Sequence, residues 1–425
     1  MKTYDNIHKG LLKIETLYNN AMRVNKKELF KVAEYLVKMQ KEDGSFGLID
    51  DYRIDADCAI EYGFVPTYYC AAILMKTSLL CEVNELKDVE EALSRALVFC
   101  ERRKLRGSGF DTVSGLVKSL NIFINAGVFE WINKEENRKN SFIAIIKDSL
   151  EFMETAVDTG RTVYDWQIDY KNEFTDIVSA YHKSIYPEDK EVWYVAYGSN
   201  INEERFLEYI NRCTDKTYSV ESKYYEIPYS IYFAGKSARW DNAAVAFLDT
   251  NSKGVAIGRA YKITMKQLDE IQYMEGSKYD KRVFLGNEEG LPAFTFTSSR
   301  KLSNKTPDKA YLDVILKGLT ETDKVRSEEV LKYYLINRVL NEKQISVIKV
   351  LRQAEHGLSI YDIAEKVNMP INEISDGVIA LSKLIGLIKQ DGRSIASGVE
   401  TNDRKAVYYT VKEYRNIMDM LVIRN

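Results

Sequence analysis

Apolar side chains recur at helical spacing through the first 187 residues. Leu29, Ala33, Leu36 and Val37 illustrate the pattern, because they fall three or four positions apart and would share one helix face. Helices are predicted over residues 29–40, 68–80, 89–100, 113–126, 143–153 and 174–186. Turns with Gly, aromatic and acidic residues separate the members of each pair. A helix, a turn and a return helix at intervals of about 55–65 residues predict stacked helical hairpins.

The pattern changes near residue 187, where short β-branched and aromatic runs replace the helical spacing. Val192–Ala196 is predicted to be a buried strand that ends in the tight turn Tyr197–Asn200. Further strands are expected over 229–234, 243–249, 258–263, 281–285 and 293–297, and helices over 203–210, 265–273, 310–317 and 327–339. These elements predict a mixed α+β barrel over residues 190–340.

A third pattern begins at residue 341. Helices are predicted over 343–353, 359–367 and 373–385, with Ser359 as the N-cap of the second. Two strands, 387–390 and 406–411, flank a polar hairpin. Three helices and a β-wing are typical of a winged helix-turn-helix. The expected fold is therefore multidomain: an all-α helical-hairpin domain over 1–187, the barrel over 190–340 and the winged helix over 341–425.

The composition is that of a globular protein. The 425 residues are 45% hydrophobic and 29% charged, with a net charge of -3, which argues against disorder and against a protein coated in nucleic acid. The five cysteines form no C-x-x-C pair, so neither a disulfide framework nor a zinc ribbon is expected. The N-terminus lacks a signal-peptide core, and the most apolar run, Tyr68–Cys81, is too short to span a bilayer. We therefore expect a cytoplasmic protein without membrane contact.

The C-terminal region has nearly balanced charges, whereas a DNA-binding module usually has a basic face. The third predicted helix carries Glu373 and Asp376 against Lys383 alone, and it has no Arg to read guanine. Dimerisation or docking to another protein is therefore favoured over DNA. The cations of the hairpin keep DNA open as a partner, because they could contact phosphates: Lys389, Arg393, Arg404 and Lys405.

A strand-to-helix turn and an acidic helix end carry the candidate chemistry of the middle region. Gly198 allows a ligand to approach the backbone closely, and amides at the start of the next helix can receive a carboxylate. About 75 residues later, Glu275 precedes Gly276 among apolar and aromatic neighbours. Such surroundings raise a carboxyl pKa and suit the group to proton transfer. Taken separately, the two features also fit an ordinary turn and a solvated helix end.

Together these segments resemble the gamma-glutamylcyclotransferase superfamily. The resemblance covers about 130 residues and includes Phe233–Trp240, which is similar to a branch that places Ser and Arg-Trp before a strand. Four motifs carry it in order: Tyr197-Gly198-Ser199-Asn200-Ile201, Gly258-Arg259-Ala260-Tyr261, Glu275-Gly276 with Tyr279, and Pro307-xxx-Tyr311-xxx-Ile315-xx-Gly318-Leu319-x-Glu321.

The resemblance implies a small barrel with a cavity at one end and a cofactor-independent, metal-free enzyme. The loop Tyr197, Gly198, Ser199, Asn200 and Ile201 would bind a γ-glutamyl group through its backbone amides. By the same resemblance Glu275 would be the general base and acid, and Tyr279 would line the pocket. The products would be 5-oxoproline and a free amine from a γ-glutamyl amine or peptide.

One segment departs from that family. Gln272-Tyr273-Met274 stands where many relatives have an Asp-rich turn, so the resemblance does not assure binding of an acidic leaving group. Aromatic residues of the predicted barrel are expected in its core, although they could also line a wider cleft for a larger substrate: Tyr224, Tyr225, Tyr229 and Tyr232.

The N-terminal repeats resemble the α/α-toroid of terpenoid cyclases and protein prenyltransferases, on the segments Gln40–Gly47 and Gly107–Asp111. The acidic run Asp50, Asp51, Asp55 and Asp57 departs from those enzymes, since Asp55-Ala56-Asp57-Cys58 lacks the last acid of D-x-D-D. The three histidines of the chain supply no counterpart of the Asp/Cys/His zinc set. A helical scaffold or protein-binding module with a solvated acidic loop is therefore the favoured interpretation.

Two classes of function remain open from the sequence. The first is a gamma-glutamyl cyclotransferase. The second is a non-catalytic regulator in which the barrel binds a small ligand and the winged helix binds DNA or a protein. A third hypothesis joins the parts, with the helical region recruiting a peptide or protein whose γ-glutamyl group the barrel processes.

Overall fold

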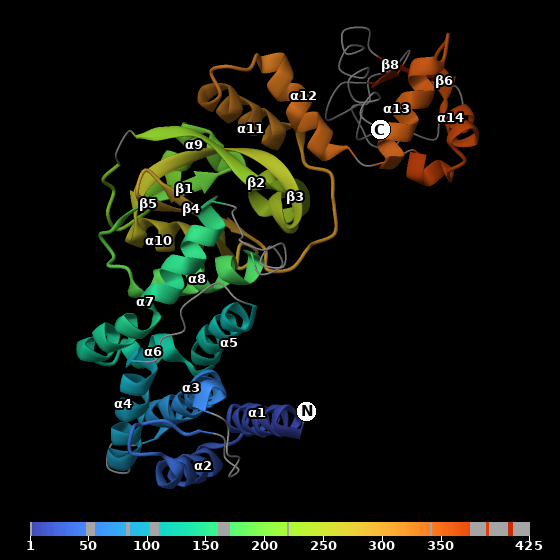
Figure 1. Ribbon diagram of the computed structural model, residues 1–425. Helices are drawn as coiled ribbons and strands as arrows, with labels where there is room; N and C mark the ends of the chain where they lie inside the picture. Colours follow the sequence, from blue (N-terminus) through green and yellow to red (C-terminus); the bar gives the residue numbers. More distant parts are fainter. Residues whose placement is uncertain are drawn as a thin grey trace. The chain divides into compact units, whose positions relative to one another are not determined.

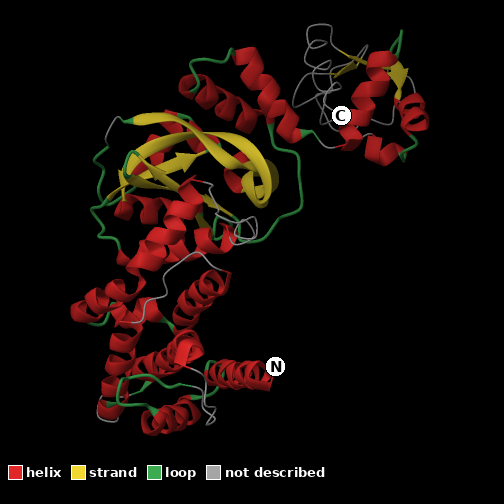
Figure 2. Ribbon diagram, in the orientation of Figure 1, coloured by secondary structure: helices red, strands yellow, loops and turns green. Residues whose placement is uncertain are grey.

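The computed structural model describes residues 2–47, 56–81, 86–102, 110–159, 171–218, 221–340, 342–374, 388–390 and 407–410. The chain divides into two compact units (Figures 1 and 2). One unit comprises Met1–Lys190 with Val283–Pro292, and the other comprises Glu191–Arg282 with Ala293–Asn425. Within the described residues, no helix combines the length and apolar character that a bilayer crossing requires. The three-domain division stays a prediction.

The first unit is helical, and each of its six predicted helices is present. Its helices are α1 (Lys2–Ala21), α2 (Lys26–Met39), α3 (Ala56–Leu80), α4 (Lys87–Arg102), α5 (Phe110–Ala126), α6 (Val128–Ile132), α7 (Glu136–Thr159) and α8 (Lys171–Ile185). Helix α4 contacts both α2 and α7, and α5 contacts both α3 and α8. The hairpins therefore stack in two layers of helices. Closure into an α/α-toroid stays a prediction.

Helix α3 begins earlier than the sequence suggested. Pro66 was expected to precede the helix, but it lies inside α3, which starts at Ala56. Proline removes one helical hydrogen bond and usually breaks a helix. Here Tyr68–Met75 is a continuous run of buried residues, and α3 contacts α1, α2, α4, α5 and α6. Packing on all sides supplies more stabilisation than the missing hydrogen bond removes.

The turn Gln40–Gly47, which carried the toroid resemblance, joins neighbouring repeats. The Gln40 amide group donates to the carbonyl oxygens of Gly44, at 3.1 Å, and of Ala92 on α4, at 2.8 Å. Arg95 of α4 donates back to Gln40 Oε1 at 2.6 Å. Asp43 accepts from the amide and hydroxyl of Ser45, which closes the turn. The second and third turns and the acidic residues at 50, 51 and 55 lie outside the described residues.

The segment Val283–Pro292 is part of the compact unit that contains the helices. Phe284 is fully buried, and its amide donates to Ser179 Oγ of α8 at 2.9 Å. The ring of Phe284 also meets the face of buried His182 edge-on, with centroids 5.4 Å apart. These contacts depend on residues about a hundred positions away, which local pattern does not reveal.

A five-stranded sheet with the order β2-β3-β1-β5-β4 forms the centre of the α+β region. Its strands are β1 (Glu191–Ala196), β2 (Ser222–Ser237), β3 (Ala243–Thr264), β4 (Lys281–Glu288) and β5 (Leu291–Thr297). Strand β1 pairs antiparallel with β3 and parallel with β5. The predicted strands 243–249 and 258–263 are one long strand, β3, because the whole segment pairs with β2 in a curved hairpin. Register shifts near Ile227 and Ala234 accommodate that curvature.

Helices surround this sheet at the predicted places. They are α9 (Glu203–Ile210), α10 (Met265–Glu275), α11 (Lys309–Thr322) and α12 (Glu328–Val339). Helix α10 begins with a capping box in which Thr264 and Gln267 exchange hydrogen bonds. Phe206 of α9 stacks on Tyr261 of β3 with ring centroids 3.8 Å apart. The capping box fixes the start of α10, and the stacking of Phe206 on Tyr261 holds α9 against β3.

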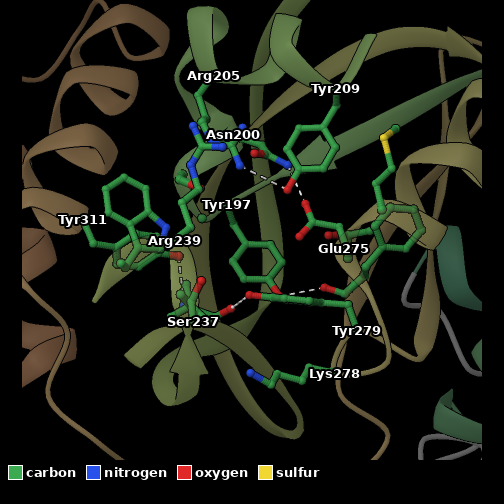
Figure 3. Close-up of a pocket in the computed structure, with 18 of the residues that line it drawn as sticks. Tyr197, Asn200, Arg205, Tyr209, Ser237, Arg239, Glu275, Lys278, Tyr279 and Tyr311 are labelled. Carbon is green, nitrogen blue, oxygen red and sulfur yellow. Dashed lines mark hydrogen bonds between the residues drawn. The ribbon is translucent and has the colours of Figure 1, made fainter. Parts of the chain in front are cut away.

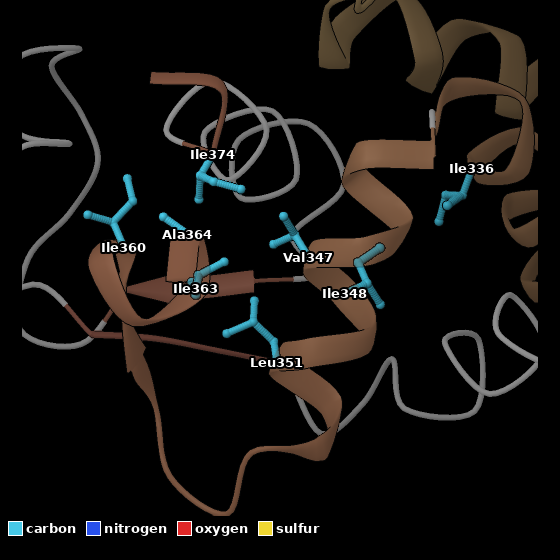
Figure 4. Packing of buried hydrophobic residues seen from close by; sticks show 8 residues of the cluster. All are labelled: Ile336, Val347, Ile348, Leu351, Ile360, Ile363, Ala364 and Ile374. Carbon is cyan, nitrogen blue, oxygen red and sulfur yellow. The ribbon is translucent and has the colours of Figure 1, made fainter. Parts of the chain in front are cut away.

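The C-terminal region has the expected first helices and a small sheet. Its elements are α13 (Glu342–Gln353), β6 (Leu358–Ser359), α14 (Ile360–Val367), β7 (Ile388–Gln390) and β8 (Val407–Thr410), with strand order β6-β8-β7. Ser359 caps α14, as predicted. Apolar residues including Val347, Leu351, Ile363 and Ile374 form its core (Figure 4). Most of the third predicted helix and the polar hairpin lie outside the described residues, so the winged helix stays a prediction.

Candidate active site

The loop after β1 turns sharply at Gly198 and enters a short 3-10 turn, η3 (Ser199–Ile201). The Ile201 and Asn202 amides donate back to the carbonyls of Gly198 and Ser199. Burial raises the pKa of the Tyr311 hydroxyl, and its interaction with the Ser199 amide lowers that pKa. In the part of the chain that the structure describes, the amides of Gly198 and Asn200 have no acceptor. The loop therefore offers two backbone donors to a ligand.

Two glycines allow the close contacts on which this loop depends. A Cβ at Gly198 would lie 3.0 Å from the Tyr311 hydroxyl oxygen. A Cβ at Gly318 of α11 would lie 2.4 Å from the Asn202 backbone nitrogen. Helix α11 thus packs directly on the backbone of the loop, and Gly318 is the position that permits this approach.

An ion-pair network fixes the end of the loop. Glu321 of α11 accepts from the Asn202 side chain at 2.9 Å and from the Glu203 amide at 3.3 Å. Arg259 of β3 donates to Glu321 at 3.3 Å and to Glu203 at 2.6 Å. Arg259 is buried, and its guanidinium also reaches Ser222 Oγ. This network couples β3, α9 and α11, so the Gly258-Arg259 motif positions the loop from outside the cavity.

Glu275 is the last residue of α10, and its carboxylate meets the loop. Asn200 Nδ2 donates to Glu275 Oε1 at 2.6 Å, although the two residues are 75 positions apart. The Tyr209 hydroxyl of α9 lies close to the same carboxylate and accepts from Arg205 Nη2 at 3.3 Å. Gly276 ends the helix with a φ of 79°, a conformation that favours glycine. The predicted acid and the predicted loop are therefore neighbours in one site.

The surroundings of Glu275 raise the pKa of its carboxyl above the ordinary value. Burial is the largest cause, because it disfavours the charged form. The hydrogen bonds from Asn200 and Tyr209 and the charge of Arg205 act in the opposite direction. Burial also raises the pKa of Tyr209 to about 12, so that phenol remains a hydrogen-bond donor at neutral pH. Because these opposing influences act on its pKa, the Glu275 carboxylate can both accept and return a proton.

A cavity of about 340 Å³ opens beside Glu275 (Figure 3). Its wall includes loop residues, aromatic rings and several cations: Tyr194, Tyr197, Gly198, Ser199, Asn200, Arg205, Tyr209, Arg212, Lys236, Ser237, Arg239, Trp240, Val245, Ala246, Met274, Glu275, Lys278, Tyr279, Thr295, Phe296 and Tyr311. Tyr279 stacks on Phe247 with centroids 4.7 Å apart and donates to the Ala246 carbonyl at 2.8 Å. The ring of Tyr279 is thus held rigidly as a wall of the cavity.

Two buried polar atoms of the wall have no partner within the described residues: Asn200 Oδ1 and Arg205 Nε. Asn200 is only 5% exposed, and Arg205 is similarly buried. Buried polar atoms are usually hydrogen-bonded, because an unsatisfied one costs about 1–3 kcal/mol. These atoms mark the wall as a place where a polar ligand would supply the missing bonds.

Six of the seven residues predicted for the site line the cavity: Tyr197, Gly198, Ser199, Asn200, Glu275 and Tyr279. Ile201 does not, because its side chain is fully buried and its carbonyl accepts from Tyr261. Sequence reasoning missed Arg205 and Tyr209, which face the site from one side of α9. Their spacing of four residues was the available signal, since such residues lie on one helix face.

The quoted motifs contained other cavity residues that were not assigned to the site. The Tyr311 hydroxyl accepts a hydrogen bond from the Ala246 amide at 3.0 Å. Lys236, Arg239 and Trp240 come from the segment Phe233–Trp240. Among the described residues, no group of three His, Cys, Asp or Glu side chains is arranged to hold a metal ion.

Comparisons with known proteins give a partial match. No protein-family model matches the chain. Histone deacetylase 5 of Arabidopsis thaliana is 25% identical over 200 residues, which is 34% of this chain and 30% of that protein. The chain thus matches less than a third of the length of this curated relative.

Similar solved structures cover about a third of this chain. A gamma-glutamyl cyclotransferase matches at 18% identity with a TM-score of 0.27, over 34% of this chain and 87% of its own. An uncharacterized protein from Homo sapiens has the same identity and TM-score, over 33% of this chain and 86% of its own. YkqA from Bacillus subtilis is 19% identical with a TM-score of 0.31, over 38% of this chain and 60% of its own.

Proposed function

We propose that the chain is an enzyme of the gamma-glutamyl cyclotransferase type, acting on a γ-glutamyl amine or peptide. The observation that carries the proposal is the contact between Asn200 and the Glu275 carboxylate at 2.6 Å inside a cavity. That contact places a carboxylate of raised pKa beside a loop with two free amides. The site thus combines a proton acceptor with donors for an oxyanion.

In this proposal the substrate supplies its own nucleophile. The α-amine of a γ-glutamyl group is mostly protonated at neutral pH, with a pKa of about 8. The ionised Glu275 carboxylate removes one proton, and the α-nitrogen then attacks the γ-carbonyl carbon. Holding the chain folded for this attack makes the reaction effectively unimolecular, which can lower its barrier by several kcal/mol. Asn200 Oδ1, buried and without a partner among the described residues, is suited to accept a hydrogen bond from the ammonium group.

The later steps use the same groups. The negative charge that develops on the carbonyl oxygen would be stabilised by the amides of Gly198 and Asn200. As the tetrahedral intermediate collapses, the bond to the departing nitrogen breaks and Glu275 gives that nitrogen the proton it removed. The ring nitrogen loses its second extra proton through the same carboxylate, so the amine departs in its protonated form. One carbon–nitrogen bond forms and one breaks, so no water is consumed. The products are 5-oxoproline and a free amine, and Glu275 is ionised again.

The test is a panel of γ-glutamyl amines and peptides incubated with the full chain, with 5-oxoproline measured by mass spectrometry. Glu275→Gln should lower kcat by about 10²–10⁴-fold, because a general acid-base group contributes about that much. The matched control is Glu270→Gln on the same helix. Glu270 binds Thr214 and lies outside the cavity wall, so this variant should retain activity. Unchanged turnover in Glu275→Gln contradicts the assigned role.

A non-catalytic sensor is the second candidate. It draws support from the C-terminal region, where the order α13, β6, α14, β7, β8 and the sheet order β6-β8-β7 fit a winged helix. A sensor would bind a γ-glutamyl compound without releasing 5-oxoproline. In that case Glu275→Gln would change only the affinity of the protein for this compound. A salt-dependent shift of DNA by the full chain would favour DNA as its partner, whereas its absence would favour protein docking.

A further inference from the structure

The cavity wall carries five cationic side chains and one acidic side chain. The cations are Arg205, Arg212, Lys236, Arg239 and Lys278, and the acid is Glu275. The chain as a whole has a net charge of -3, so this local excess of positive charge is not a property of the overall composition. A cavity lined by one sign of charge concentrates ligands of the opposite sign.

Part of the positive charge is neutralised from outside the cavity. Arg205 donates to Glu208 at 2.7 Å, and Arg239 donates to the same carboxylate at 2.8 Å. One carboxylate therefore serves two guanidinium groups. Arg212, Lys236 and Lys278 form no ion pair within the part of the chain that the structure describes. The wall retains a positive excess that a ligand could neutralise.

Three of the five cations come from segments other than the loop after β1 and α9. Lys236 is the second-last residue of β2, Arg239 lies in the adjoining turn η4 (Ala238–Trp240), and Lys278 follows α10 by three residues. All three are exposed, whereas Asn200 is buried. The Lys278 ammonium group donates to the Lys236 carbonyl, which joins two of these segments. Figure 3 shows Arg239 and Lys278 at the border of the pocket that holds Glu275. These three exposed cations form a mouth, which we define as Lys236, Arg239 and Lys278.

We propose that this mouth binds the leaving part of the substrate and selects γ-glutamyl conjugates whose departing amine carries additional negative charge. The inference rests on the proposed function, in which the buried loop amides bind the glutamyl end. That end carries one ammonium and one carboxylate group, so it does not call for several exposed cations. A carboxylate or phosphate on the departing amine would lie at the mouth and neutralise them.

This preference was not apparent from the sequence, because the segment Gln272-Tyr273-Met274 before Glu275 carries no charge. The cations instead come from segments about 40 residues apart, as Lys236 and Lys278 show. Exposed charges contribute little singly, yet several around one cavity act together on a ligand that enters it. We therefore expect a charge preference of about fivefold to tenfold in kcat/KM at low salt.

The experiment compares two substrates that differ by one charge, γ-glutamyl-glutamate and γ-glutamyl-glutamine. The full chain should turn over the charged peptide with the higher kcat/KM, by about fivefold to tenfold. Raising the salt concentration should reduce this ratio, because mobile ions screen exposed charges. The double variant Lys236→Met/Lys278→Met should bring the ratio close to one. The control Lys253→Met removes an exposed cation of β3 outside the cavity wall and should leave the ratio unchanged.

The outcomes separate this inference from the proposed function. Equal turnover of both peptides by the full chain, or a ratio that the double variant leaves unchanged, overturns the inference and leaves the cyclotransferase proposal standing. If neither peptide releases 5-oxoproline, their binding to the full chain is compared by calorimetry. Tighter binding of γ-glutamyl-glutamate that depends on Lys236 and Lys278 then supports the mouth, and equal or undetectable binding of the two peptides overturns it.

Discussion

Two glycine-containing turns of this protein resemble motifs of known families, yet they differ in how their polar groups are used. In the helical unit, Gln40 is fully engaged by the carbonyls of Gly44 and Ala92 and by Arg95. In the sheet region, the Asn200 amide group donates a hydrogen bond to Glu275. Asn200 Oδ1 has no partner among the described residues. The first turn is a structural joint. The second turn retains a polar atom that could form a hydrogen bond with a ligand. This difference distinguishes a structural turn from a candidate binding site.

The glycines of the two turns should respond differently to substitution, and this is the largest expected effect. Gly198 has a φ of −93°, so a side chain there strains no backbone but projects toward Tyr311 and the cavity. Gly198→Val should lower kcat/KM by about 100-fold, because its methyl groups would occupy the space of the substrate. The measurement is 5-oxoproline release against protein concentration and melting temperature.

Gly44→Ala is the companion variant. Gly44 has a φ of 89°, and a Cβ there would lie 2.4 Å from the Arg95 carbonyl oxygen. It should destabilise the helical unit by about 1–3 kcal/mol, as overpacking does, and leave turnover of the folded protein unchanged. If Gly44→Ala abolished activity in folded protein, the distinction between joint and site would be wrong.

The next effect concerns Asn200. Its amide group donates to Glu275 and so lowers the pKa of that carboxyl, which burial raises. Asn200→Ala should reduce kcat/KM by about tenfold near neutral pH. Because the reaction needs ionised Glu275, the acidic limb of the pH profile should move to higher pH in the variant. A uniform loss at every pH would show that Asn200 acts on binding rather than on the carboxyl.

A smaller effect is expected at Gln40. Gln40→Ala leaves the carbonyls of Gly44 and Ala92 without their donor, which should cost about 1–2 kcal/mol of unfolding free energy. The first transition in the urea unfolding curve of the full chain measures this loss of unfolding free energy. Activity should stay within about twofold of the original, and a large loss would assign the turn to the site.

The smallest effect is a change of stability with pH in Glu275→Gln. The folded state raises the pKa of Glu275, so its contribution to stability is fully present below the unfolded pKa of about 4.3 and is lost as pH rises through the folded pKa. Removing the charge should therefore raise the melting temperature at pH 8 by about a few degrees, relative to the original chain. At pH 4 the two proteins should melt together. A variant that melts lower at pH 8 would indicate that the ionised carboxylate stabilises the fold.

Several elements of the fold could be predicted from short-range patterns in the sequence. The strand Val192–Ala196 and the helix over 203–210 were predicted within a residue of β1 and α9, because β-branched runs and helical spacing are short-range signals. Ser359 was recognised as a cap for the same reason. Pro66 misled the prediction, because proline acts locally while the packing that holds α3 together comes from five other helices.

Only part of the candidate site could be predicted from such sequence patterns. Its loop and Glu275 were found through their motifs, whereas Arg205 and Tyr209 were not, because nothing local distinguishes them from other residues of an amphipathic helix. Ile201 was assigned to the site by position in the motif, yet the 3-10 turn directs it into the core. The cations of the mouth were missed because they belong to different segments.

The sequence by itself determined the elements, their caps and the two segments that can do chemistry, since each depends on neighbours within a few residues. Only the tertiary structure decided that Asn200 and Glu275 meet, because β1 and β3 pair side by side and α10 continues directly from β3. It also decided which charges remain unneutralised, as Glu208 shows by serving two arginines from separate segments. Coulombic interactions and packing act through space, and the order of residues along the chain does not encode those distances directly.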